Sequence, residues 1–400
     1  MKSRQAQLPE GWEMKKLGEV CDILDSKRKP ITKRNRIAGE IPYYGATGVL
    51  SYVKDYLFDE KLVLLGEDGA KWECGDNSAF VIEGKTWVNN HAHVLRTHKE
   101  MLIEEWLVYN LNFQNLMPFV TGMTVPKLNQ GSMRNIPIPI PPLPEQRAIV
   151  ALLDAAFAKI DQAKANIEKN IENARELFQS KLNEVFSQRG EGWEEKTVDS
   201  ISKIVNGHSF KSRDFNPNYE IKAIKITNVG IKEFVEDDSN NLPVSFLKDY
   251  SKVKISEGSI VLALTRTIIS GGLKVAKVPS SYHNSLLNQR VAAIMADEAV
   301  INKDYLFYYF SSKIVYDYVL NNVNTLMQPN LSIADLRKMP VPVTTLENQL
   351  KLSSQIKKLS YQSELLIENL NRKLQNLDDL KKSLLQKAFA GELTHSAIPA

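Results

Sequence analysis

The chain has 400 residues, which is too many for one compact core, so we expect two or more domains. A net charge of +4, from 51 basic and 47 acidic residues, does not by itself indicate a nucleic-acid partner. No apolar run could span a bilayer, the first residues lack the apolar core of a signal peptide, and Cys21 and Cys74 are the only cysteines. We therefore expect a cytoplasmic protein without a disulfide or a cysteine metal site.

Residues 1–143 contain sequence patterns of both strands and helices, which predicts an α+β domain. Short apolar runs bounded by glycine and polar turns, such as "KLVLLGEDG", predict strands, and "EMLIEEWLVYNLNFQNLM" predicts a helix. Early in this region, "SKRKPITKRNR" at 26–36 concentrates six basic residues without an acidic one. This stretch is either a solvated loop or a segment that contacts phosphates.

The next feature is the proline-rich stretch "IPIPIPPLPEQRAIV" at 136–150. Proline fixes φ and lacks an N–H, so we interpret the stretch as a stiff extended strap outside any sheet interior, which ends where Pro144 starts a helix. A mechanical joint is favoured over a ligand for an SH3-like partner, because a related stretch recurs at 339–352.

From Glu145 onward, apolar residues recur in alternating steps of three and four over about six heptads, which is typical of a coiled coil. A core helix of a bundle is the alternative. At about 1.5 Å per residue such a helix would be roughly 65 Å long. The predicted helical segment is 144–190.

The second half of the chain repeats the first. Gln349 lies 203 residues after Gln146, and Pro329 lies 203 after Pro126, whereas Trp193 follows Trp12 by 181. Because 203 exceeds 181 by 22, the second copy has gained 22 residues between its Gly-Trp start and its proline segment. Residues 191–343 therefore form a second mixed domain, and 344–400 a second long helix with a tail.

The predicted architecture is α+β. Two domains of mixed α/β content, 1–143 and 191–343, are separated by two long helices that form an antiparallel coiled coil, with a pseudo-twofold internal repeat.

This layout, with "LPEQRAIVALLDAAFAKID" in the first copy and "KSLLQKAFAGEL" closing the second, resembles the specificity (S) subunit of type I restriction-modification systems over essentially the whole chain. The resemblance implies two target recognition domains and two conserved spacer helices. The second copy departs from the pattern, with "VTTLENQ" in place of "PPLPEQ".

The resemblance also implies a division of labour. This chain would read an asymmetric bipartite target in double-stranded DNA, catalyse nothing and bind no cofactor. Its partners would be two modification (methyltransferase) subunits, which use S-adenosylmethionine, and two restriction (translocase/nuclease) subunits, which use ATP and magnesium. The coiled coil would set the spacer between the half-sites and dock the modification subunits.

Two other function classes stay open. A stand-alone metal-dependent nuclease is suggested by Asp76, Glu83 and Lys85, which imitate a D…ExK set, and a structural coiled-coil adaptor by the long helices. His91 and His93 could ligate a metal, but no third ligand with suitable spacing follows, so no metal site is predicted. "GEDG" at 66–69 is not followed by a convincing helix and is a poor nucleotide loop.

Candidate DNA-binding residues are the basic, amide and hydroxyl side chains of predicted loops, because these groups contact phosphates and base edges. In the first domain they are Thr47, Lys71, Asn90 and His91 for bases, with Lys27, Arg28, Arg34 and Arg36 for phosphates. In the second domain they are Ser209, Lys211, Ser212, Asn228, Thr265, Arg266, Thr267, Gln289 and Arg290. Just before the straps, Thr124 and Lys127, or Thr325, Gln328 and Asn330, could reach DNA from equivalent places. Each could instead serve a turn or a solvated surface, so the prediction concerns the set.

Overall fold

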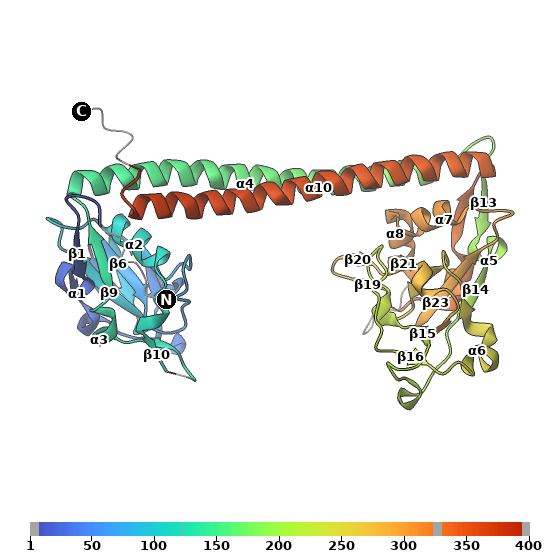
Figure 1. Ribbon diagram of the computed structural model, residues 1–400, viewed down its shortest axis with the longest axis horizontal. Coiled ribbons are helices and arrows are strands. Elements are labelled where there is room, and N and C mark those ends of the chain that lie inside the picture. The colour runs from blue at the N-terminus through green and yellow to red at the C-terminus, as the bar shows by residue number, and fades with distance from the viewer. Residues whose placement is uncertain (1–7, 123, 323–329, 394–400) are drawn as a thin grey trace. The chain divides into compact units, whose positions relative to one another are not determined.

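The computed structural model describes residues 8–122, 124–322 and 330–393 (Figure 1). The chain divides into two compact units, which are described separately here. Unit 1 comprises the chain up to Ile167 together with the part from Asn371 onward, and unit 2 comprises Glu168–Leu370. None of the helices in the described ranges is long and apolar enough to cross a membrane.

Unit 1 contains two four-stranded sheets. The first is antiparallel, and one of its two inner strands, β6 (Leu62–Gly66), is a fully buried apolar run, which suits the centre of a covered sheet. The helix α2 (Glu104–Phe113) packs on β6 and β7 (Ala79–Ile82) and places Trp106 in the core. The first sheet has the order β2 (Cys21–Ile23), β9 (Ala92–Thr97), β6 (Leu62–Gly66), β7 (Ala79–Ile82), and the second β4 (Gly48–Val53), β3 (Ile41–Gly45), β8 (Lys85–Val88), β5 (Phe58–Asp59).

Unit 2 repeats this topology. Its two four-stranded sheets have the orders β14 (Ser202–Asn206), β23 (Val291–Ala296), β18 (Ile260–Ala263), β21 (Val275–Lys277) and β16 (Asn241–Leu242), β15 (Ile221–Ile224), β22 (Ser285–Leu287), β17 (Lys254–Ile255). The helix α7 (Lys303–Phe310) covers the first of these sheets, as α2 does in unit 1. The predicted mixed architecture and the internal repeat are confirmed.

Smaller elements complete both units. In unit 1 they are α1 (Leu17–Val20), α3 (Gln130–Met133) and the pair β10 (Val120–Thr121) and β11 (Lys127–Leu128). In unit 2 they are α5 (Val198–Ile201), α6 (Phe246–Asp249), α8 (Lys313–Asn322), α9 (Ile333–Lys338) and the pair β19 (Ile268–Ile269) and β20 (Gly272–Leu273).

The proline-rich stretch is a paired strand, which refines the prediction of a free strap. β12 (Pro137–Ile140) pairs antiparallel with β1 (Glu13–Lys16) in a two-stranded ribbon, so the prolines stay out of a sheet interior. β24 (Pro340–Val343) pairs with β13 (Glu194–Thr197) in the same way. Each ribbon leads directly into a long helix.

The two long helices are α4 (Leu143–Phe186) and α10 (Leu346–Phe389), each of 44 residues. In unit 1, the Lys164 ammonium lies 2.7 Å from the Asp378 carboxylate, and Lys381 lies 3.6 Å from Asp161. In unit 2, Ser363 donates to the Ala174 carbonyl at 3.4 Å. Residues 161, 164 and 174 of α4 thus lie next to residues 381, 378 and 363 of α10, so the residue numbers increase in opposite directions along the two helices. The predicted antiparallel pairing is confirmed within each unit. The predicted division into two domains and two helical segments differs from the division into compact units, because each unit contains a part of each long helix.

The end of α10 completes the core of unit 1. Phe389 packs on Trp106 and Phe113, with ring centroids 5.0 Å apart in both contacts. Ala388 is fully buried in the same cluster. Residues from both ends of the chain therefore share one apolar core.

Candidate nucleic-acid interface

Several predicted residues of unit 1 meet where the β6–β9 ladder ends. Beyond the last pair, Gly66 with Ala92, the Glu67 N–H donates to the His91 carbonyl at 2.8 Å. The His91 ring lies 2.5 Å from the Asp68 carboxylate. The backbones of Asp68 and Lys127 form an isolated antiparallel β-bridge. We call Asp68, Asn90, His91 and Lys127 the first edge.

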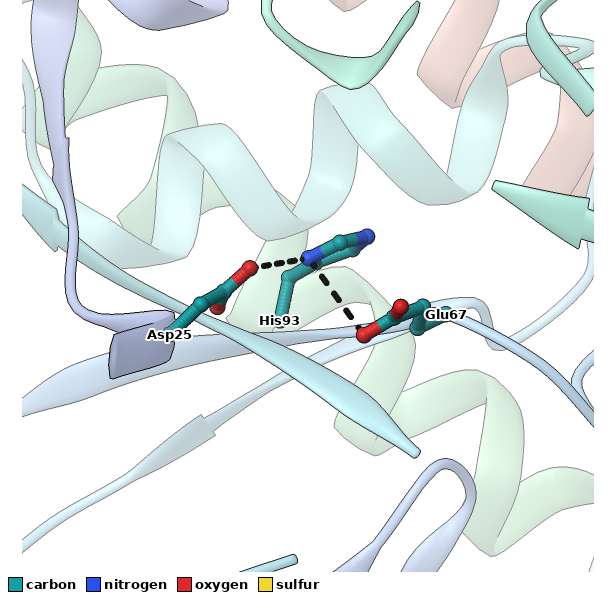
Figure 2. A group of neighbouring side chains, drawn as sticks. All are labelled: Asp25, Glu67 and His93. Atoms are coloured by element: carbon teal, nitrogen blue, oxygen red, sulfur yellow. Dashed lines mark hydrogen bonds and ion pairs between the residues drawn. The ribbon is translucent and has the colours of Figure 1, made fainter. Parts of the chain in front are cut away.

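Next to the first edge, the side chains of Asp25, Glu67 and His93 form a cluster, in which His93 contacts both carboxylates (Figure 2). His93 contacts the Asp25 carboxylate through Nδ1 at 2.6 Å and the Leu128 carbonyl through Nε2 at 2.7 Å. The Leu128 carbonyl can only accept, so Nε2 carries a hydrogen, while Nδ1 faces the Asp25 carboxylate. The same Nδ1 also lies 3.8 Å from Glu67.

Two cations balance the carboxylates of this cluster. Arg28 contacts Glu67 at 2.5 Å and Asp25 at 3.3 Å, and it donates to the Ala92 carbonyl at 2.7 Å. Lys127 contacts the other oxygen of Glu67 at 2.8 Å. We call Asp25, Arg28, Glu67, His93 and Lys127 the buried network, of whose five side chains only that of Lys127, 42% exposed, also belongs to the first edge.

Burial alone would raise the pKa of both carboxyls, but their partners lower them. For Asp25, the hydrogen bond and charge of His93, the Val94 N–H and Arg28 outweigh burial and lower the pKa. For Glu67, hydrogen bonds from Lys127 and Arg28 outweigh burial and also lower the pKa. The hydrogen bond to Glu67 raises the pKa of Lys127. Both carboxyls are therefore ionised at neutral pH.

The network has the residue types of a metal site but not the available ligands. Asp25, Glu67 and His93 bring one ligand atom each within 4.8 Å of the others, the one such group among the described residues. Arg28 and Lys127 already neutralise the carboxylates, and both ring nitrogens of His93 are engaged, Nδ1 with Asp25 and Nε2 with the Leu128 carbonyl. His91 and His93 do not share a partner, because the His91 ring contacts Asp68 and the His93 ring contacts Asp25.

Two predicted phosphate ligands of unit 1 are engaged elsewhere. The Arg28 side chain is 12% exposed and held by two carboxylates, so the prediction that it reaches a phosphate does not fit. Arg36 donates to the Ile31 carbonyl and to Ser51, and its guanidinium lies 4.2 Å from the Tyr43 ring centroid. The other predicted residues of unit 1 are all exposed: Lys27 and Arg34 lie in the short 3-10 helices Asp25–Lys27 and Lys33–Asn35, and Thr47, Lys71 and Thr124 lie outside helices and strands.

A corresponding edge forms in unit 2. The Leu264 N–H donates to the Arg290 carbonyl at 2.8 Å, and the Arg266 N–H donates to the Asn330 side chain at 3.3 Å. Arg266 and Arg290 have φ of 48° and 70°, a left-handed backbone that is costly for arginine and is seen at binding sites. We call Thr265, Arg266, Gln289, Arg290 and Asn330 the second edge.

Lys274 is a residue of this region that the sequence did not reveal. Burial, together with the charge of Arg266, lowers the pKa of Lys274, and its ammonium donates to the Ile226 carbonyl at 2.9 Å. Asp25, Glu67 and Asp68 of unit 1 were not predicted either, because DNA-binding side chains are mostly cationic or amide groups. For Glu67 and Asp68, the acidic pair in "GEDG" is the feature of the sequence that indicates them.

Two predicted base-reading residues of unit 2 are buried instead. Asn228 is 1% exposed, and its amide accepts from the Lys225 N–H and donates to the Val235 carbonyl, so it holds a turn. Thr267 is fully buried. Ser209, Lys211 and Ser212 are exposed on the loop after β14, whereas Thr325 and Gln328 lie outside the described residues.

The nuclease-like triplet also has a local explanation. Asp76 accepts a hydrogen bond from the Glu73 N–H at 2.8 Å within a tight turn, and the Lys85 ammonium lies 5.0 Å from the Tyr56 ring centroid. These contacts do not assemble a metal-binding set.

The fold defines a duplicated protein, in which one mixed domain occurs twice and presents different side chains at the two edges. A family model described as "Type I restriction modification DNA specificity domain" matches residues 9–173 and again 190–376. The chain belongs to this family and carries the domain twice.

Relatives and solved structures agree with this assignment. The chain is 25% identical to the type I restriction enzyme MjaVIII specificity subunit of Methanocaldococcus jannaschii, over 96% of this chain and 94% of the relative. It is 30% identical to a putative type I restriction enzyme specificity subunit of Haemophilus influenzae, over 74% and 76% respectively. The HsdS subunit from Thermoanaerobacter tengcongensis has the same fold, with a TM-score of 0.60 and 17% identity over 98% of this chain and 100% of that one. The resemblance inferred from the sequence is confirmed, and the specificity-subunit interpretation is supported over the nuclease and the adaptor.

Proposed function

We propose that this chain is the DNA sequence-recognition subunit of a type I restriction-modification complex, in which each unit reads one half of a bipartite target. The observation that carries the proposal is that the two units repeat the same sheet topology but present different side chains at the first edge and the second edge. Two readers built on one frame suit two different half-sites, which together make the target asymmetric.

The chemistry of the edges supports this asymmetry. The first edge offers Asp68 and His91, and the second offers Arg266 and Arg290. In the major groove, arginine suits the acceptors of guanine, and a carboxylate suits the amino group of cytosine. The first and second half-sites should therefore differ in the base types that they present.

The long helices have two roles in the proposal. They set the number of unread base pairs between the half-sites, since their length is fixed by the α-helical rise. They also dock two modification subunits, and exposed apolar side chains such as Leu177, Tyr361 and Leu366 in unit 2 suit protein contact. One solved chain of the same fold, with a TM-score of 0.75, comes from a study of complex assembly in a type I R-M system.

The remaining chemistry belongs to the partners. We propose that the chain is non-catalytic and binds no cofactor, that modification subunits use S-adenosylmethionine, and that two restriction subunits use ATP and magnesium. The complex would act on chromosomal DNA in the cytoplasm.

Long-read detection of methylated adenines in cells that carry this system tests the proposal. The expected result is one asymmetric bipartite motif that disappears when the chain is deleted. Methylation without a bipartite motif would contradict the proposal, and so would magnesium-dependent DNA cleavage by the purified chain alone.

A further inference from the structure

The register of the two main sheets allows the units to be compared residue by residue. Gly66 pairs with Ala92 in unit 1, and Ala263 pairs with Val291 in unit 2. One residue further, the Glu67 N–H bonds the His91 carbonyl, and the Leu264 N–H bonds the Arg290 carbonyl. Glu67 therefore corresponds to Leu264, and His91 to Arg290.

A third strand extends the correspondence. The Leu128 N–H donates to the Glu67 carbonyl at 2.8 Å, and the Leu331 N–H donates to the Leu264 carbonyl at 3.0 Å. Lys127 therefore corresponds to Asn330. The same backbone frame supports the first edge and the second edge.

The side chains on this frame differ in one respect. Glu67, His93 and Lys127 of the buried network correspond to Leu264, Ala292 and Asn330, because His93 pairs with Leu65 as Ala292 pairs with Leu262.

The segment that carries the rest of the network differs in length. In unit 1 four residues, 25–28, separate Leu24 from Lys29, whose N–H groups bond the carbonyls of Val94 and Val88. In unit 2 two residues, 206–207, separate Val205, which pairs with Ala293, from His208, whose N–H bonds the Leu287 carbonyl. Asp25 and Arg28 lie on the longer segment.

The frame therefore forms without the buried network, so the network is not a requirement of the fold. Nor is it an efficient way to gain stability, because apolar side chains in place of a buried ion pair are often neutral or stabilising. The network connects four parts of unit 1 through its side chains: the segment after β2, the end of β6, the start of β9, and β11. Arg28 also bonds the Asn90 and Ala92 carbonyls, on either side of His91.

We propose that the buried network is a specificity determinant of unit 1 alone, which positions the first edge for reading its half-site, whereas unit 2 positions the second edge without it. The members other than Lys127 are positioning residues, because they lie beneath the surface that meets DNA. This inference rests on the proposed function.

The test uses the full chain in the complex that it forms in its cells, with duplexes that carry the methylated motif intact or with one half-site scrambled. A photo-crosslinker on Cys74, the exposed cysteine of unit 1, assigns one half-site to that unit. The readout is the ratio of dissociation constants for scrambled and intact duplexes, measured for each half-site.

Glu67→Gln removes one charge with little change of shape. It should lower discrimination at the unit 1 half-site by about tenfold or more and leave the other half-site within about twofold. The matched control is Glu60→Gln. The Glu60 carboxylate lies 2.6 Å from Arg96, which is on β9 as His93 is, but further from the first edge. Equal changes at both half-sites would overturn the proposal, as would a lower melting temperature with unchanged ratios.

A second variant covers the case in which Glu67→Gln does not fold. It combines Glu67→Leu and His93→Ala with Asp25→Asn and Arg28→Gln and keeps Lys127 of the first edge, so that unit 1 carries the side chains of unit 2 at the two corresponding buried positions and loses the charges beneath the edge. This variant should fold, since unit 2 folds with those side chains, and should lose discrimination at the unit 1 half-site only. Wild-type discrimination by the folded variant would overturn the proposal. If the wild-type complex itself did not discriminate, the proposed function would fail instead.

Discussion

Gln146 and Gln349 make the same three hydrogen bonds in their respective units. The side-chain oxygen of Gln146 accepts from the Ile103 N–H, and that of Gln349 accepts from the Asn302 N–H, in each case the residue just before a core helix. The two amide nitrogens donate to carbonyls of the preceding loop and of the joint, Met101 and Pro141 in unit 1 and Val300 and Thr344 in unit 2. Each glutamine thus ties a long helix to its globular part.

Replacing either glutamine should therefore loosen its own unit. Gln146→Ala or Gln349→Ala leaves buried backbone groups without partners, at a cost of about 3 kcal/mol. Hydrogen exchange should speed up in α2 for the first variant and in α7 for the second. Gln162→Ala, on the exposed face of α4, is the matched control. Similar losses in the two units would also show that the second joint is as firm as the first, although its later prolines are missing.

Two arginines of the basic stretch at 26–36, Arg34 and Arg36, should have different roles. Arg34 is exposed, so Arg34→Ala should weaken binding of all DNA sequences alike and reduce the slope of log affinity against log salt by about 1. Arg36 holds Ile31 and Ser51, so Arg36→Ala should mainly loosen its loop. Binding titrations over a salt series distinguish the two effects. A change of sequence preference in Arg34→Ala would instead mean that Arg34 reads bases.

The spacer of the target should follow the length of the long helices. Inserting one heptad into both α4 and α10 adds about 10 Å, which corresponds to about three base pairs. The methylated motif of such a strain should keep both half-sites and gain the extra unread positions. An unchanged spacer would show that the helices do not set it.

Acid should loosen unit 1 before unit 2. The pKa values of Asp25 and Glu67 are lowered in the fold, so their contribution to stability is present above their ordinary values near 4. It is lost as the pH falls through the lower folded values. Hydrogen exchange corrected for its intrinsic pH dependence should therefore rise in β6 and β9 before β18 and β23. The Glu67→Gln variant should show a smaller acid effect.

The repeat made much of this fold predictable. The spacing of Gln146 and Gln349 and the steps of three and four that follow define the joints and the long helices, because both are local patterns. Burial of particular side chains was not predictable in this way. Arg28 lies in a basic stretch typical of phosphate contacts, but Glu67, 39 residues away in the sequence, neutralises it in the fold. Asn228 and Thr267 looked like readers because a sequence does not reveal which polar groups the core encloses.

Gly391 should tolerate no side chain. Its φ of +73° disfavours other residues, and an added Cβ would collide with Pro9. Gly391→Ala should destabilise unit 1 by about 2 kcal/mol. Gly11→Ala is the control, since Gly11 also has a positive φ but nothing within 4 Å of an added Cβ, so it incurs only the backbone cost. Thermal unfolding compares the two.

The packing of Phe389 on Trp106 and Phe113 determines an order of events during synthesis. Unit 2 is one continuous stretch, Glu168–Leu370, which is synthesised before Ala388 and Phe389. Unit 1 is begun first but needs these two residues of α10 before its core can close. The unit that is begun first is therefore the last to be completed, and a nascent chain that stalls before Ala388 would carry a complete second unit and an open first one.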